Sequence, residues 1–131
     1  MVLEIVAAKD LNHAFEIVSV SPRKTMKHHV VSEPEGIDGF LYDNRNALAN
    51  YTYYYQFDPY RETQLEADQV PAIKTFSQSI VKWLEEHCTE ENRVIGQYGL
   101  SFPKIRRFAD KLGHVCDVAM EHGYGLAGLG D

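Results

Sequence analysis

The sequence predicts an α+β domain, with an antiparallel sheet from the N-terminal half and two C-terminal helices packed on one face. Short apolar runs rich in β-branched residues occupy the first half, and apolar residues at spacings of three and four occupy the second. Strands followed by helices, rather than alternating with them, are typical of this class. The 131 residues are expected to form a single domain (1–131), which is long enough to bury a core without a metal or disulfide.

The predicted strands are short and lie before residue 58. Residues 2–7, 15–20 and 30–31 are apolar and β-branched. Residues 37–42 and 47–57 are expected to form a hairpin around a polar turn. Along the second strand of that hairpin, alternate side chains should share one face: Tyr51, Tyr53, Tyr55 and Phe57. Tyr54 should then lie on the opposite face.

Two long helices are predicted after the sheet, at residues 69–88 and 102–122, with a short strand at 93–98 between them. The apolar stripe of the first helix is Ile73, Phe76, Ile80, Trp83 and Leu84, and His87 continues the same spacing. The stripe of the second is Ile105, Phe108, Ala109, Leu112, Cys116 and Ala119. Ser101 is a suitable N-cap for the second helix. Gly123 suits its C-terminus, where a positive φ is needed.

Composition and charge restrict the classes of function. The net charge of −6 argues against a nucleic-acid binder, because affinity for phosphates comes from clustered lysine and arginine. No stretch approaches the ~20 apolar residues of a membrane span. The N-terminal residues lack the pattern of a secretory signal. We therefore expect a cytoplasmic protein with reduced cysteines and no membrane partner.

Few residues suggest enzymatic chemistry or a cofactor. His114, Asp117 and Glu121 lie three and four apart, so they share a helix face that could hold zinc or manganese. The same face carries Arg107 and Lys111, which is typical of a solvated surface. Residues 123–128 match the dinucleotide-binding string of glycines, but a helix precedes them, so a glycine-rich tail is expected. The sequence predicts no enzyme, no catalytic residue, no metal and no cofactor.

The most informative segment is acidic and aromatic. Residues 33–68 hold eight acidic and two basic residues, which gives the full net charge of −6, and six of the eight tyrosines. Tyrosine is enriched at binding hot spots, and a negative patch accelerates encounter with a basic partner. The candidate partner-binding residues are Tyr42, Asp43, Tyr54, Asp58, Tyr60, Glu62, Glu66 and Asp68. The alternative is that one tyrosine row is core and the acids confer solubility.

A second charged segment, at residues 23–29, is basic. It could contact a phosphate or an acidic partner, although a solvated loop is the simpler interpretation.

The C-terminal quarter resembles the immunity proteins of bacterial polymorphic toxins, which are the inhibitors encoded beside contact-dependent toxins. The residues that carry the resemblance are Phe108-Ala109, Leu112, Met120-Glu121-His122-Gly123-Tyr124-Gly125-Leu126 and Gly130-Asp131. The resemblance implies a protein that binds a cognate toxin and occludes its active site. With the acidic segment, it favours a basic nuclease as the target. The alternatives are a small metal-dependent enzyme using His114, Asp117 and Glu121, and a regulatory interaction module.

Overall fold

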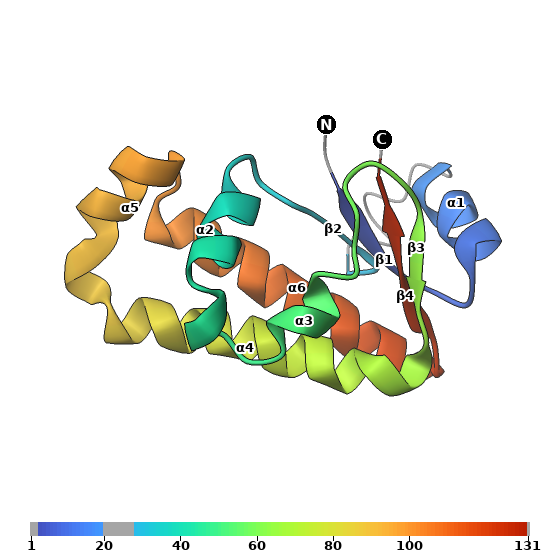
Figure 1. Ribbon diagram of the computed structural model, residues 1–131. Coiled ribbons are helices and arrows are strands. Elements are labelled where there is room, and N and C mark those ends of the chain that lie inside the picture. Colours follow the sequence, from blue (N-terminus) through green and yellow to red (C-terminus); the bar gives the residue numbers. More distant parts are fainter. Residues whose placement is uncertain (1–2, 20–27, 131) are drawn as a thin grey trace.

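A four-stranded antiparallel sheet forms one end of the molecule. The computed structural model describes residues 3–19 and 28–130 (Figure 1). The strands are β1 (Glu4–Ala8), β2 (Val30–Ser32), β3 (Thr63–Leu65) and β4 (Gly125–Leu129), in the order β2-β1-β4-β3. Three strands come from the first half of the chain, and β4 joins them from its last described residues. The predicted α+β class with an antiparallel sheet is confirmed.

Both faces of the central strands are buried. Ile5 and Ala7 of β1 belong to the main core, whereas Val6 and Ala8 belong to a smaller cluster with Ala14 and Ile17. Successive side chains of a strand point to opposite faces, so α1 (Leu11–Ser19) covers one face and α6 (Phe102–His122) the other.

The two predicted long helices are confirmed as α4 (Val70–Glu86) and α6, which lie side by side along the base of Figure 1. Their predicted apolar residues are buried in the main core. Ser101 caps α6 by accepting a hydrogen bond from the Lys104 amide at 3.4 Å, and Gly123 ends it with φ 72°. Within residues 3–19 and 28–130, none of the helices combines the length and the apolar content of a membrane-spanning segment.

Three predicted strands are helices in the structure. Residues 15–20 overlap α1, residues 37–42 belong to α2 (Ile37–Asp43), and residues 93–98 belong to α5 (Glu91–Tyr98). In α2, the buried residues Ile37, Phe40 and Leu41 are spaced three and four apart, which is a helical period. The strand predictions relied on β-branched and aromatic content. They were wrong because these segments form helices.

The predicted hairpin strand at residues 47–57 is also wrong. It contains the end of a 3₁₀ turn (Arg45–Ala47) and the short helix α3 (Tyr51–Tyr54). Tyr54 and Phe57, three apart, are buried, whereas Tyr53 and Tyr55 are exposed, so side chains do not alternate as in a strand. Two further 3₁₀ turns, at Ala67–Gln69 and Cys88–Glu90, precede α4 and α5.

The predicted glycine-rich tail forms β4, which pairs with both β1 and β3. Of the basic segment 23–29, residues 23–27 lie outside the described residues.

Candidate functional site

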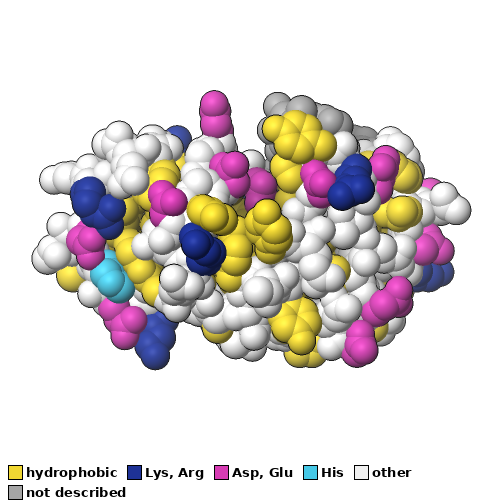
Figure 2. All heavy atoms as spheres, viewed as in Figure 1, with side chains coloured by type: hydrophobic (Ala, Val, Ile, Leu, Met, Phe, Trp, Pro, Cys, Tyr) yellow, Lys and Arg dark blue, Asp and Glu magenta, His cyan; other side chains and the backbone are white. Residues whose placement is uncertain are grey.

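A groove of about 670 Å³ opens between α2, α3 and the turn at residues 57–60. Figure 2 shows hydrophobic and acidic side chains gathered around a notch over these elements. We call it the acidic–aromatic groove, and its aromatic and acidic lining residues are Tyr42, Tyr51, Tyr54, Tyr55, Phe57, Tyr60, Glu33, Glu35 and Asp38. None of the described residues that line it is a lysine or arginine. The groove therefore combines negative charge with a large aromatic surface.

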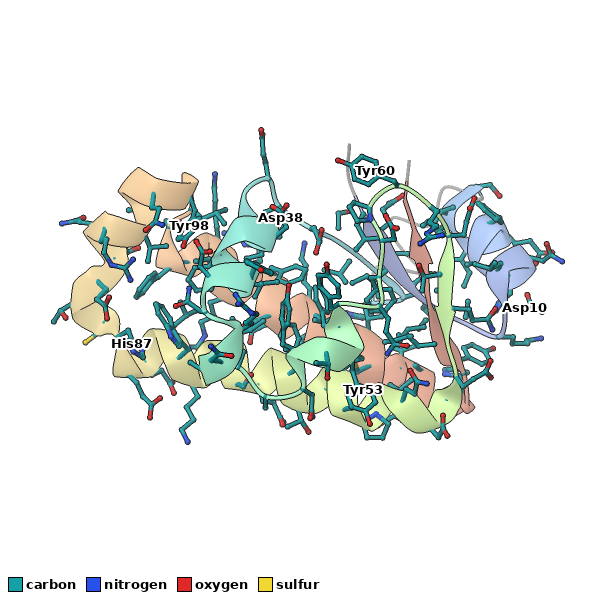
Figure 3. The ribbon with its side chains drawn as sticks, in the orientation of Figure 1. Asp10, Asp38, Tyr53, Tyr60, His87 and Tyr98 are labelled. Atoms are coloured by element: carbon teal, nitrogen blue, oxygen red, sulfur yellow. The ribbon has the colours of Figure 1, made fainter. Side chains whose placement is uncertain are left out.

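Three tyrosines at the groove are unusually exposed for aromatic residues. The exposed fractions of Tyr42, Tyr55 and Tyr60 are 49%, 66% and 69%. Asp38 and Tyr60 lie on opposite sides of the groove in Figure 3. Tyrosine offers a large rigid area and a polar hydroxyl, which suits it to contact with another molecule.

Neighbouring side chains hold two of these rings in place. The Tyr55 ring packs against Tyr51, with centroids 5.7 Å apart. The Arg45 guanidinium lies over the Tyr42 ring at 4.0 Å, and its Nη1 donates to the Tyr42 carbonyl oxygen at 2.7 Å. A tyrosine at the groove thus already makes a cation–π contact within the chain.

Glu33 is a largely buried carboxylate in the groove lining. Burial raises the pKa of Glu33, the hydrogen bond from the Tyr54 hydroxyl opposes that rise, and the charge of Asp38 adds to it. Tyr54 is held by stacking on Phe76, with ring centroids 4.6 Å apart. Burial is also the main cause that raises the pKa of Tyr54 well above its usual value, followed by the charge of Glu33. Tyr54 therefore remains a neutral donor to Glu33.

Tyr54→Phe is expected to lower the free energy of unfolding by about 1.5–3 kcal/mol, because it removes a hydrogen bond to a charged group from a buried site. Urea denaturation at pH 7 measures the change. The control is Tyr53→Phe on the same helix. Its side chain is exposed, so a change within about 0.5 kcal/mol is expected. Equal effects of the two substitutions would contradict a supporting role for the Tyr54 hydroxyl.

Glu33→Gln is expected to make the protein more stable than the wild type at pH 7. The raised pKa means that the folded state binds the Glu33 proton more tightly than the unfolded state. Wild-type stability should therefore fall as the pH rises from the unfolded pKa, near 4.5, through the folded pKa. Glutamine cannot ionise, so the variant should lack this loss, while the exposed Glu35→Gln should retain it. Urea denaturation between pH 4 and 8 distinguishes the two, and parallel pH profiles for wild type and Glu33→Gln would contradict the assignment.

The predicted partner-binding residues divide between the groove and other places. Tyr42 and Tyr60 line it as exposed side chains. Tyr54 also lines it, but only 5% of the residue is exposed, and its hydroxyl donates to Glu33. Asp43 accepts a hydrogen bond from the Tyr98 hydroxyl at 2.5 Å.

The remaining predicted acids do not line the groove. Asp58 shapes the turn beside it by accepting from the Tyr60 amide at 2.8 Å and pairing with Arg61 at 2.9 Å. The amide hydrogen bond is the main cause that lowers the pKa of Asp58. Glu62, Glu66 and Asp68 are exposed along the chain on either side of β3.

The predicted binding residues omitted six aromatic and acidic residues of the groove lining: Glu33, Glu35, Asp38, Tyr51, Tyr55 and Phe57. The usable signal was the group of three acids within residues 33–38, around the start of α2. The strand predicted for residues 37–42 hid this signal, because side chains of a strand alternate between two faces, whereas those of α2 can line one side of the groove.

The candidate metal-ligating residues and the two cysteines form no second site among the described residues. Asp117 accepts from Lys74 Nζ at 3.0 Å, and no group of three or more His, Cys, Asp or Glu side chains at residues 3–19 and 28–130 could hold a metal ion. Cys116 is buried, which raises the pKa of its thiol to about 12 and leaves it unreactive at neutral pH. Cys88 is an exposed free thiol.

Comparison with known proteins found no matching family model, no matching curated protein and no matching solved structure. The chemistry of the groove itself is therefore the basis for inferring a function.

Proposed function

We propose that this protein is an immunity protein that binds a basic toxin, with a nuclease as the favoured target, and blocks its active site. The observation that carries the proposal is the acidic–aromatic groove, where exposed tyrosines surround three carboxylates and no lining residue among those described is basic. A cytoplasmic location is part of the same proposal.

The charge of the groove supports a basic partner. Glu33, Glu35 and Asp38 lie within ten residues of chain and line one hollow. Like charges brought together in this way repel, so a cationic partner that docks there relieves the repulsion. Association with such a partner should be fast and should slow as salt is added.

The exposed aromatic area supports a protein partner. Tyr42, Tyr55 and Tyr60 present rigid rings around the carboxylates. Aromatic anchors surrounded by polar groups are the usual arrangement of an interface hot spot. In this proposal the carboxylates take the positions of substrate phosphates, and the tyrosines hold the toxin in place.

The test uses the protein encoded upstream of this chain's gene, whose C-terminal domain is the candidate toxin. We expect the purified chain to abolish the domain's nuclease activity at an equimolar ratio, and we expect the association rate to fall as salt rises from 50 to 500 mM. Binding without inhibition would instead support a regulatory interaction module. Absence of binding at micromolar concentration would overturn the proposal.

A further inference from the structure

A second hollow, of about 640 Å³, lies between the segment at residues 32–36, the turn at residues 98–100 and α6. Residues 34–36 line both this hollow and the acidic–aromatic groove. Its charge has the opposite sign, because Lys104, Arg107 and Lys111 line it against one carboxylate, Glu35. Three cations and one anion give the lining a net charge of +2, in a chain whose net charge is −6.

The three cations share one face of α6. They lie at positions i, i+3 and i+7, which places them about 4.5 and 6 Å apart along the helix axis. Their neighbour Arg106 has carboxylate partners, Glu85 and Asp110, both at 3.7 Å. By contrast, none of the described carboxylates lies within 4.0 Å of the charged nitrogens of Lys104, Arg107 or Lys111. The three positive charges therefore repel one another, and an anion bound among them would relieve that repulsion.

Part of the lining of the hollow is apolar. It is formed by the buried side chains of Leu100 and Phe108 and by the half-buried Tyr98. The backbones that form the rim are in direct contact, since a Cβ on Gly36 would lie 2.4 Å from the Tyr98 carbonyl oxygen. Gly36 also has φ 91°, which a larger residue rarely adopts. The rim is therefore part of the packed structure.

We propose that this hollow binds a small phosphate monoester, with the phosphate on Arg107, Lys104 and Lys111 and the organic group against Tyr98 and Leu100. A guanidinium presents paired donors that match two phosphate oxygens, and each ammonium adds a point charge. Its volume lies within the range of small-molecule sites, which usually combine apolar walls with a few convergent polar groups. This site is independent of the proposed immunity function.

The test is a titration followed by amide NMR shifts, with phenyl phosphate as the probe and inorganic phosphate as the comparison. We expect saturable binding of phenyl phosphate at the 98–100 turn and the first turns of α6, at least threefold tighter than inorganic phosphate. Arg107→Gln and Lys111→Gln should each weaken binding about tenfold, which corresponds to the loss of one charge-assisted contact. The control Lys82→Gln removes the same charge from an exposed position of α4 that does not line the hollow, and it should change nothing.

Three outcomes would overturn the proposal. Equal weakening by Lys82→Gln would reduce the effect to general attraction of anions. Equal affinity for phenyl phosphate and inorganic phosphate would show that Tyr98 and Leu100 do not bind the organic group. Binding of a single-stranded oligonucleotide more than tenfold tighter than phenyl phosphate, with shifts extending to Arg106 and His114, would assign this face to nucleic acid, because a further hollow along α6 includes those two residues.

Discussion

Gly125→Ala is expected to lower the free energy of unfolding by about 3 kcal/mol or more. A Cβ at this position would lie 2.1 Å from the Leu65 carbonyl oxygen, which is a backbone atom and cannot rotate away. Gly125 begins β4, whose next residue pairs with Leu65 of β3. To remove the clash, β3 and β4 must separate, which costs ladder hydrogen bonds and exposes the buried Leu65. Urea denaturation monitored by circular dichroism measures the loss.

Gly96→Ala is the matched control. Gly96 lies in α5, where an added Cβ would meet no atom within 4 Å. Alanine in a helix is more favourable than glycine by about 0.5–1 kcal/mol, so this variant should be slightly more stable than the wild type. Similar stability of the two alanine variants would contradict the close pairing of β3 with β4.

The long helices could be predicted because many residues report the same period. The stripe from Ile73 to Leu84 spans three turns, and the stripe from Ile105 to Ala119 spans four, with caps at Ser101 and Gly123. The short helices offered only one to three buried residues each, such as Ala14 and Ile17 in α1 and Val94 in α5. With so few positions, a helical period cannot be distinguished from a buried strand. The predictions for these segments then followed the strand preference of their residues and were wrong.

The strand β4 could not be predicted from local preference. Its sequence, Gly-Leu-Ala-Gly-Leu, has two glycines, which weaken a strand. It forms because β1, from the opposite end of the chain, pairs with it along five residues. Its glycines also allow neighbouring atoms to approach more closely than a side chain would permit. Both reasons are tertiary contacts, which local sequence preference does not report.

The candidate site was predicted in its composition but not in its arrangement. Excess acid and tyrosine identified residues 33–68, and two of the named tyrosines, Tyr42 and Tyr60, are exposed at the groove. The acids that line the groove with them come from residues 33–38, not from residues 62–68. The fold of the chain brings these acids and tyrosines to one groove. Counting charges along a sequence does not show which residues meet in space.

Combined replacement of Tyr55 and Tyr60 by alanine is expected to weaken binding of the proposed toxin partner by about a thousandfold. Truncation of one hot-spot tyrosine costs ~2 kcal/mol, or about thirtyfold, and the two losses add when the side chains do not contact each other. The loss should lie in the dissociation rate, since anchors hold the formed complex. Surface plasmon resonance with the immobilised toxin domain measures both rates.

Tyr53→Ala and charge reversal complete the test. Tyr53 is 40% exposed and also belongs to α3, but it does not line the groove and lies away from Tyr60 in Figure 3, so its loss should leave both rates unchanged. Asp38→Lys should instead slow association and weaken its salt dependence, because a rim charge acts mainly on encounter. Glu62→Lys makes the same charge change outside the groove and should have the smaller effect. If Tyr53→Ala weakens binding as much as the double variant does, or if Glu62→Lys slows association as much as Asp38→Lys, the toxin does not dock in the acidic–aromatic groove.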